Sequence, residues 1–306
     1  MVFLARPEGF ELPRRSGTPF HHAYMEASMT NTQKRRLGVL TSGGDAPGLN
    51  AVIRAVVKMG NGLGYEVLGI QQGYEGLLGD TDYRVLTGAD VRGLLPRGGT
   101  ILRTTNKGHF SGKHVEGAKH DPYSEALENI QKLGLNGLIT IGGEGTQGIA
   151  LELVRMGAPI IGVPKTIDND LPGTDRTFGF DTALQVATDA IDRLHTTAAS
   201  HNRVMVLEVM GRHAGWIALH SGIAGGADVI LIPEIPFDIQ LVADKIMERE
   251  KYGSNFSIIV AAEGAMPKGG TAFYMAPGRL GGVGNSVTEQ LAQMTGKDCR
   301  CVVLGH

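Results

Sequence analysis

The chain has 306 residues, of which 42% are hydrophobic and 20% charged, and its formal net charge is −2. The chain has no excess of basic residues, so its charge does not predict nucleic-acid binding. Its apolar runs are shorter than the ~18 residues that span a bilayer. Its 45 glycines follow apolar runs without a period, which excludes collagen-like and low-complexity chains.

Residues 1–32 differ from the rest because they are aperiodic and lack the apolar segment of a secretory signal. We expect them to be a disordered tail or the product of a gene start placed too early. Cys299 and Cys301 lie two positions apart, a spacing that rarely meets disulfide geometry. The chain is therefore expected in the reducing cytoplasm.

From Arg36 onwards, short apolar runs alternate with amphipathic segments. We expect strands at 37–40, 66–70, 135–141, 160–163, 204–209, 229–232, 257–261 and 300–304. Helices are expected at 49–59, 181–197, 237–250 and 285–294. Continuously apolar strands that alternate with helices predict an α/β protein with mostly parallel sheets covered on both faces.

Glycine and polar clusters recur where these strands end, and ligands of such sheets bind at the carboxyl ends of strands. The clusters lie at 42–48, 98–99, 142–146, 164–170, 210–212 and 263–264. Their shared placement predicts one convergent site. We place a domain boundary near residue 180, before the long helix.

The stretch 142–146 reads Gly-Gly-Glu-Gly-Thr and is the most informative of these clusters. Its glycines let backbone amides approach phosphate oxygens, and the carboxylate of Glu144 could hold Mg²⁺ against them. It therefore predicts a magnesium–nucleotide site. The loop 42–48 also precedes a helix, but alone it fits a plain tight turn as well as a phosphate site.

The stretch 164–170 reads Pro-Lys-Thr-Ile-Asp-Asn-Asp and follows a predicted strand. In extended backbone, Asp168 and Asp170 would face the same way. One could accept a proton from a substrate hydroxyl while the other organises Mg²⁺ or the loop. The alternative is a local Asx-turn or cap, chiefly for Asp170.

Cationic side chains flank several predicted strands. Arg212 suits bidentate recognition of a phosphate, although a single arginine more often forms a surface ion pair. Arg203, Arg212, Arg300 and His306 together resemble an anion pocket. Glu263 could accept hydrogen bonds from sugar hydroxyls.

Six motifs in this order resemble those of the 6-phosphofructokinase family, in its phosphofructokinase A, mixed-substrate-like group, from about residue 36 to 306. They are LTSGGDAPGLNAVIRAV (40–56), IGGEGT (141–146), PKTIDND (164–170), GTDRTFGFDTA (173–183), EVMGR (208–212) and VLGH (303–306). The resemblance implies two Rossmann-like three-layer α/β domains with the active site in the cleft between them. Residues 33–179 would bind the phosphoryl donor and 180–306 the sugar phosphate.

The same resemblance implies a cytoplasmic homo-oligomer, a tetramer or dimer, without nucleic-acid or membrane partners. It would transfer a phosphoryl group from MgATP to the 1-hydroxyl of fructose 6-phosphate in glycolysis. The implied catalytic group is Asp168 as proton acceptor with Gly145, Lys165 and Thr166. The implied donor site comprises Gly44, Tyr74, Asn106, Lys107, Gly143, Glu144, Gly145 and Thr146, with Mg²⁺ on Glu144. The implied sugar-phosphate site comprises Thr166, Asp168, Met210, Gly211, Arg212, Glu263, Arg300 and His306, and Arg203 would reach into a neighbouring subunit.

Position 145 bears on the donor. In the family, glycine there accompanies ATP and aspartate accompanies pyrophosphate, because a carboxylate would repel the α-phosphate. Lys165 is common in pyrophosphate enzymes, but members with both Gly145 and this lysine resemble ATP enzymes. We therefore predict ATP, with pyrophosphate as the alternative.

Three departures from the family pattern stand out. Asn106 occupies the place of an arginine, for which Lys107 or Arg103 could substitute. Arg54 and Lys58 match the family's effector pocket, but the usually basic positions 252, 254 and 256 hold Tyr, Ser and Phe, which predicts weak or absent regulation by ADP and phosphoenolpyruvate. The family continues past position 306 with a Gln-Arg-Gly-Gly turn, so we expect a truncated chain, or an inactive fragment that only binds a ligand or partner.

Overall fold

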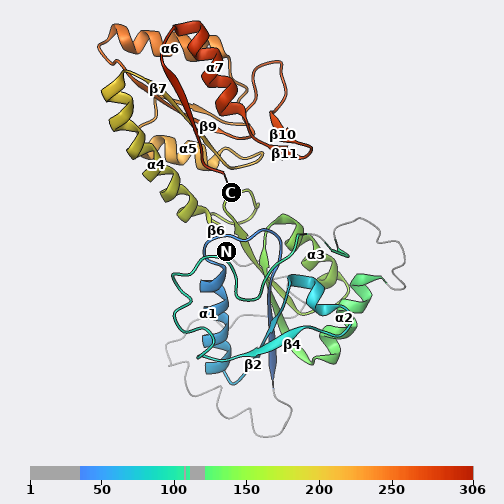
Figure 1. The fold of residues 1–306 in the computed structure, drawn as a ribbon. Coiled ribbons are helices and arrows are strands. Elements are labelled where there is room, and N and C mark those ends of the chain that lie inside the picture. The colour runs from blue at the N-terminus through green and yellow to red at the C-terminus, as the bar shows by residue number, and fades with distance from the viewer. Residues whose placement is uncertain (1–34, 107, 111–120, 306) are drawn as a thin grey trace, which may run out of the picture. The chain divides into compact units, whose positions relative to one another are not determined.

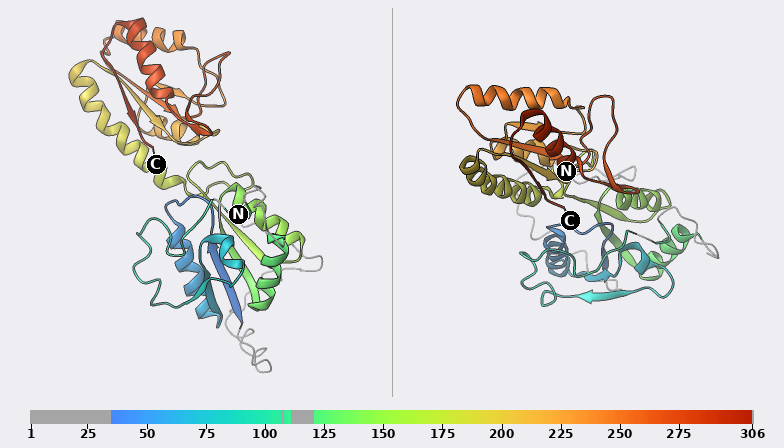
Figure 2. Two further views of the ribbon diagram at one scale, coloured as in Figure 1. Left: turned by 45° about the vertical axis from the view of Figure 1, so that its right-hand side comes forward. Right: turned by 45° about the horizontal axis from the view of Figure 1, so that its top comes forward.

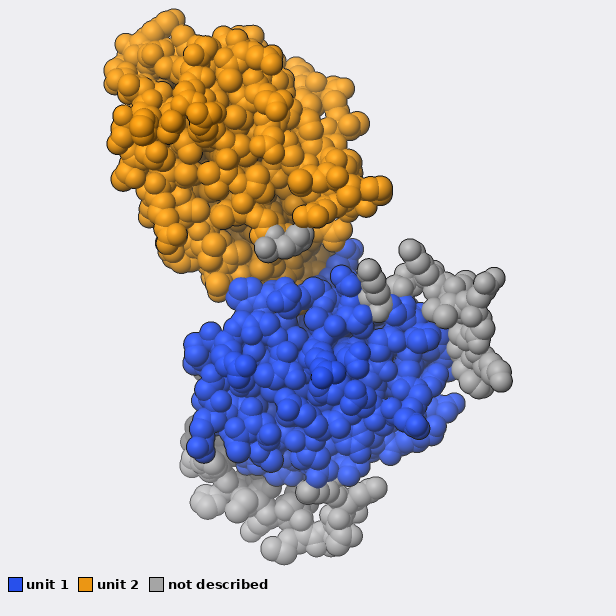
Figure 3. All heavy atoms as spheres, in the orientation of Figure 1, with its two compact units in different colours: residues 1–164 blue, residues 165–306 orange. Residues whose placement is uncertain are grey.

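The computed structural model describes residues 35–106, 108–110 and 121–305. The chain divides into two compact units, residues 1–164 and 165–306, which Figure 3 shows in blue and orange. The expected tail at residues 1–32 lies outside the described residues.

The first unit is built on a sheet with the strand order β3-β2-β1-β4-β5-β6. The strands of this sheet are β1 (Arg36–Thr41), β2 (Glu66–Ile70), β3 (Tyr83–Leu86), β4 (Leu135–Gly142), β5 (Ile160–Thr166) and β6 (Phe178–Gly179). The last two residues of β5 and all of β6 belong to the second unit. The helices of the first unit are α1 (Leu49–Gly62), the 3-10 helix η1 (Gly73–Leu77), α2 (Pro122–Lys132) and α3 (Glu144–Arg155). β1 pairs in parallel with β2 and β4, and β4 with β5, whereas β3 is antiparallel to β2. β5 continues across the unit boundary, where Lys165 and Thr166 pair with β6.

Apolar side chains cover both faces of this sheet, because successive strand residues point in opposite directions. Val39 packs with Ile53 and Val57 of α1 on one face. Leu40 packs on the other face with Ile130 of α2 and Leu153 of α3. Figures 1 and 2 show α1 on one side of the strands and α2 with α3 on the other.

The second unit contains a parallel sheet with the order β12-β7-β9-β8. Its strands are β7 (Val204–Val209), β8 (Val229–Leu231), β9 (Ser257–Ala262) and β12 (Cys299–Val303), and a small hairpin joins β10 (Tyr274–Ala276) to β11 (Arg279–Leu280). Its helices are α4 (Phe180–His201), α5 (Trp216–Ala224), α6 (Ile239–Lys251) and α7 (Val283–Thr295). One core cluster joins the sheet to α4 and α5, and another joins it to α6 and α7. Both faces are therefore covered, as in the first unit (Figure 1).

The predicted α/β class with mostly parallel sheets is confirmed. The predicted helix at 49–59 is α1, and that at 181–197 is the central part of α4, whose Ala187 and Ile191 are buried. The predictions gave no bounds for η1, α2, α3 and α5, and they omitted β3, β6 and the β10–β11 hairpin. The assignment of donor binding and sugar-phosphate binding to separate domains stays a prediction. Among the described residues, no helix has the length and apolar character required to cross a membrane.

Candidate active site

In the first unit, the loop after β1 and the start of α3 lie together at the carboxyl edge of the sheet. β1 and β4 are neighbours, and the Ser42 amide donates to the Ile141 carbonyl oxygen (3.0 Å). The Gly43 amide donates to the carbonyl oxygen of Thr105 (3.0 Å), which fixes the neighbourhood of Asn106 against this loop. The structure thus brings Gly44, Asn106 and the start of α3 to one edge. Lys107 lies outside the described residues.

Helix α3 begins at Glu144, with Gly143 as its N-cap and no side chain capping it. The first amides of a helix lack intrahelical acceptors, and they favour anions. A Cβ at Gly142 would approach Thr146 Oγ1 to 2.2 Å, so the turn requires glycine there. A Cβ at Gly145 would meet no atom within 4 Å. A side chain at 145 would therefore enter open space beside the helix N-terminus.

Glu144 is exposed in the first turn of α3. The described residues contain no cluster of three or more His, Cys, Asp or Glu side chains that could hold a metal. A single carboxylate at a helix N-terminus whose amides favour anions nevertheless fits Mg²⁺, which keeps several waters and takes its other ligands from phosphates.

Tyr74 contacts the turn at 142–146 through Thr146. It is 2% exposed, and its hydroxyl donates to the Thr146 carbonyl oxygen (3.1 Å). Burial raises the pKa of its phenol, so the hydroxyl stays a donor. Tyr74 therefore contacts the expected donor site through Thr146, and its contact with a nucleotide stays a prediction.

Two amide side chains that the sequence analysis missed also fix this edge. Gln147 Nε2 donates to the carbonyl oxygens of Gly142 (3.0 Å) and Val163 (3.1 Å), which ties α3 to the ends of β4 and β5. The buried Asn50 donates to the Gly98 carbonyl oxygen (3.1 Å) and accepts from the Ile101 amide (2.9 Å). The sequence does contain a signal for Asn50, because this polar residue lies on the buried side of the amphipathic helix α1.

In the second unit, Asp168 is the most unusual charged residue. It is 7% exposed, and its Oδ1 has no hydrogen-bond partner among the described residues. Burial raises its pKa to about 6, with smaller contributions from the carboxylates of Asp170 and Glu263, while the cations Arg212 and Lys165 act in the opposite direction. These five groups therefore form one electrostatic cluster. A buried, unpartnered carboxylate with a shifted pKa is typical of a functional site.

The turn after β7 contributes Arg212 to this cluster. The Arg212 amide donates to Glu263 Oε1 (3.0 Å), which joins the ends of the neighbouring strands β7 and β9. Gly211 has φ 145°, and a Cβ there would approach the Ala214 carbonyl oxygen to 2.3 Å. Glycine is therefore required at 211, beside Met210, for Arg212 to take this position.

Arg203 and Arg300 lie elsewhere. Both bind Asp298, Arg203 through Nε (2.6 Å) and Arg300 through Nη2 (3.1 Å). The hydrogen bond from Arg203 is the main cause that lowers the pKa of Asp298. Arg203 precedes β7 and Arg212 follows it, so they are separated by roughly 20 Å, the length of a six-residue strand. The structure thus brings Arg203 and Arg300 together without Arg212. The last member of the expected anion pocket, His306, lies outside the described residues.

Comparisons with known proteins identify relatives of this chain. The family model described as Phosphofructokinase matches residues 36–306. An ATP-dependent 6-phosphofructokinase of Chloroflexus aurantiacus is 73% identical over 276 residues, which are 90% of this chain and 78% of that protein. A pyrophosphate–fructose 6-phosphate 1-phosphotransferase of Streptomyces coelicolor is 51% identical over 280 residues, 89% of this chain and 79% of that protein.

Solved structures give the same result. Phosphofructokinase from Pichia pastoris in the T-state matches with a TM-score of 0.78 and 33% identity. The match covers 90% of this chain and 30% of that chain, so this chain spans less than a third of the Pichia chain's length. The family match, the identity of the bacterial relatives and the shared fold show that the chain belongs to the phosphofructokinase family.

Proposed function

We propose that this protein transfers a phosphoryl group from MgATP to the 1-hydroxyl of fructose 6-phosphate and releases fructose 1,6-bisphosphate and ADP. It would act as a cytoplasmic kinase of glycolysis. The observation that carries this proposal is the buried carboxylate of Asp168, whose Oδ1 has no hydrogen-bond partner in the described part of the structure and which has Arg212 and Lys165 near it. The named activity of the 73% identical relative supports it.

Asp168 would accept the proton of the attacking hydroxyl. A pKa of about 6 leaves the group mostly deprotonated at neutral pH and basic enough to take a proton in the transition state. Arg212 would bind the sugar phosphate through its guanidinium, with Met210 and Gly211 shaping the turn. Thr166 and Glu263 would bind sugar hydroxyls.

The donor would bind at the carboxyl edge of the first unit. The amides of Gly44, Gly143, Gly145 and Thr146 would contact the phosphates, and Asn106 would extend this surface. Lys107 stays a predicted donor-site residue. Glu144 would hold Mg²⁺, which neutralises charge on the phosphates when bound. Tyr74 would act on the site through Thr146.

Arg203 and Arg300 support a homo-oligomer, a tetramer or dimer. Their shared position beside Asp298, at the far end of β7 from Arg212, fits contribution to the site of a neighbouring subunit better than to their own. No nucleic-acid or membrane partner is proposed.

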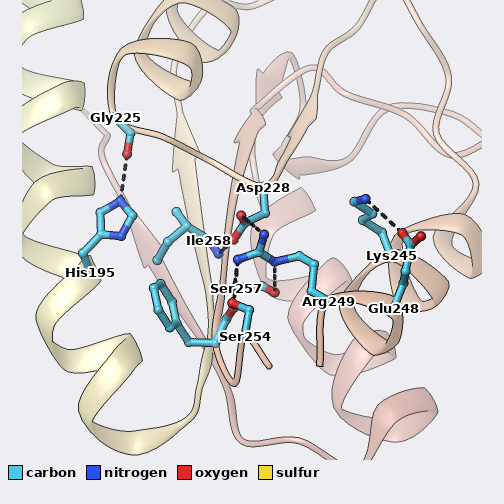
Figure 4. A network of polar contacts seen from close by, with 10 residues as sticks. His195, Gly225, Asp228, Lys245, Glu248, Arg249, Ser254, Ser257 and Ile258 are labelled. Carbon is cyan, nitrogen blue, oxygen red and sulfur yellow. Dashed lines mark hydrogen bonds and ion pairs between the residues drawn. The ribbon is translucent and has the colours of Figure 1, made fainter. Parts of the chain in front are cut away.

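We also propose that anionic effectors regulate this protein only weakly. The basis is the set of charged side chains around a cavity of about 260 Å³ at the end of α6. Lys245 binds Glu248 (2.9 Å) and Arg249 binds Asp228 (2.7 Å), as Figure 4 shows. Tyr252 and Ser254 line the same cavity. Because each lining cation already has a carboxylate partner, an added anion would gain little there.

The donor is tested by assaying the protein with MgATP and with pyrophosphate. We expect turnover with MgATP alone. A carboxylate at 145 would enter the open space at the start of α3 and repel a nucleotide phosphate, so Gly145→Asp should lower kcat/KM for ATP by about 100-fold or more. Gly148→Asp is the matched control, because Gly148 is exposed on the same helix and its Cβ would also meet nothing.

The alternatives predict other results. Turnover with pyrophosphate alone would replace ATP as the donor, a possibility favoured by Lys165 and by the 51% identical Streptomyces relative. Binding of ATP by calorimetry without turnover on either donor would favour a ligand-binding protein over an enzyme.

A further inference from the structure

The loop that carries Asp168 is tied to residues 175–177 by the side chain of the next residue, Asn169. The Thr177 amide donates to Asn169 Oδ1 (2.9 Å). Asn169 Nδ2 donates to the Asp175 carbonyl oxygen (3.3 Å). One amide side chain therefore joins two backbone segments.

The hydroxyl of Thr177 adds a second tie. Thr177 is 4% exposed, and its Oγ1 donates to the Thr166 carbonyl oxygen (2.7 Å), with Asn169 Oδ1 at 3.3 Å. The buried hydroxyl of Thr177 therefore restrains the start of the loop, and the Thr177 amide, through Asn169 Oδ1, restrains its end.

The backbone of the loop is restrained as well. Asn169 has φ 54°, in the left-handed region that asparagine tolerates better than most residues. The Asp168 amide donates to Thr166 Oγ1 (3.1 Å). On the other segment, Phe178 pairs with Lys165 of β5. Both segments are thus held to the end of β5.

These ties matter because Asp168 Oδ1 has no hydrogen-bond partner within the described part of the chain. The contacts that hold the backbone on either side of Asp168 therefore restrain where its carboxylate lies. We propose that Asn169 and Thr177 are positioning residues, which fix Asp168 in the orientation that lets it accept the substrate proton. This inference rests on the proposed role of Asp168 in phosphoryl transfer.

The test is a set of variants of the full chain, assayed with fructose 6-phosphate and the donor that supports turnover. Thr177→Val keeps the shape of the side chain and removes the hydroxyl, whereas Thr177→Ser keeps the hydroxyl. Asn169→Gly keeps the left-handed backbone accessible and removes the amide. Because small misplacements of reacting groups can cost up to 100-fold in rate, we expect Thr177→Val and Asn169→Gly to lower kcat about tenfold to 100-fold.

A positioning role predicts a specific pattern in the kinetic constants. KM for fructose 6-phosphate should change less than about threefold, and Thr177→Ser should keep kcat within about twofold, because substrate contacts are not removed. Thr188→Val is the matched control: it removes a similar hydroxyl bond, to the Leu184 carbonyl oxygen (2.9 Å) in α4, and should leave kcat unchanged. Folded fraction is measured for each variant by circular dichroism, and kcat is expressed per folded chain.

The failure of this inference can be told from the failure of the proposed function by Asp168→Asn. If Asp168→Asn abolishes turnover while Thr177→Val and Asn169→Gly keep normal kcat, the positioning role is overturned and the base remains. If Asp168→Asn turns over normally, both are overturned. An equal loss of kcat in Thr177→Ser and Thr177→Val would also contradict the role of the hydroxyl.

Discussion

At the scale of single residues, Asp168 combines a favourable position for chemistry with a cost to stability. Its carboxylate is buried, and no residue between 35 and 305 that the structure describes donates a hydrogen bond to its Oδ1. Burial and neighbouring carboxylates raise its pKa from the ordinary value of 3.8 to about 6. The charged form is therefore less stable in the folded protein than in the unfolded chain.

Because the pKa of Asp168 is raised, the effect of Asp168→Asn on the stability of the protein should depend on pH. Near pH 3 the carboxyl is mostly protonated in both states and costs little. As pH rises through the window from about 4 to 6, the unfolded chain loses the proton first, so stability falls with pH. Removing the charge should thus stabilise the protein at pH 7.5, by at most about 3 kcal/mol for a shift of this size.

Thermal unfolding of both proteins at pH 3.5 and pH 7.5 measures this. We expect a higher Tm for Asp168→Asn at pH 7.5 and a much smaller difference at pH 3.5. Asp192→Asn, at an exposed position on α4, should give no such pH-dependent gain. A Tm difference that is equal at the two pH values would show that folding does not destabilise the charged form of Asp168.

The sequence could identify Asp168 but not the residues that hold it. The carboxylate stands in a recognisable motif at a strand end, so residue type and spacing were informative. Asn169 and Thr177 act through backbone atoms of other segments. Such contacts depend on the path of the loop in three dimensions, which composition and periodicity do not specify.

At the scale of elements, the junction between β7 and α7 depends on one buried carboxylate. Glu208 lies within β7 and is 2% exposed. It accepts hydrogen bonds from the amides of Gly282 (3.0 Å to Oε1) and Gly284 (2.7 Å to Oε2). Helix α7 has no side-chain cap of its own, so a carboxylate from the neighbouring strand satisfies its first amides and its dipole.

We expect Glu208→Gln to destabilise the protein. The amide keeps one acceptor but loses the charge and places donors against backbone donors, and hydrogen bonds to charged groups contribute roughly 1.5–3 kcal/mol. Urea unfolding of Glu208→Gln should show a loss of about that size. Glu289→Gln is the control, because it removes an exposed carboxylate from the same helix. Equal stability of the two variants would mean that α7 does not depend on Glu208.

The elements also show what hydrophobic patterns can predict. β7 is buried along its whole length, and its apolar run was sufficient to predict its bounds, 204–209. β3 has three exposed residues of four and lies at the sheet edge, antiparallel to β2. The β10–β11 hairpin consists of short, largely exposed strands. These strands form by backbone pairing with an adjacent strand and bury few side chains, so no apolar run in the sequence marks them.

At the scale of the whole molecule, each unit has its own pair of core clusters, one on each face of its sheet. The prediction of two domains that divide near residue 180 rests on the family resemblance, and that division stays a prediction. The grouping of cations was less predictable. Arg203, Arg212 and Arg300 all flank strands in the sequence, but only strand direction and register determine which of them share an edge.

The placement of Arg203 predicts that active sites are shared between copies of the chain. Arg203→Ala should raise KM for fructose 6-phosphate strongly, whereas Asp168→Asn should abolish turnover. If Arg203 serves a neighbouring site, a chain with Asp168→Asn can lend its Arg203 to a chain with Arg203→Ala. In randomly mixed dimers of a closed, symmetric type, about a quarter of the sites would then be intact.

The experiment unfolds and refolds the two variants together and measures activity at a low concentration of fructose 6-phosphate. We expect recovery toward that fraction, with mixed oligomers verified by native mass spectrometry. A mixture of Asp168→Asn with Asp168→Ala is the control and should recover nothing, because no chain supplies the base. Arg300 shares the Asp298 contact with Arg203, so Arg300→Ala should complement Asp168→Asn in the same way. Mixed oligomers without recovered activity would assign both arginines to the active site of their own chain. The two side chains would then have to reach from the amino end of β7 to the site of Asp168 in the same chain.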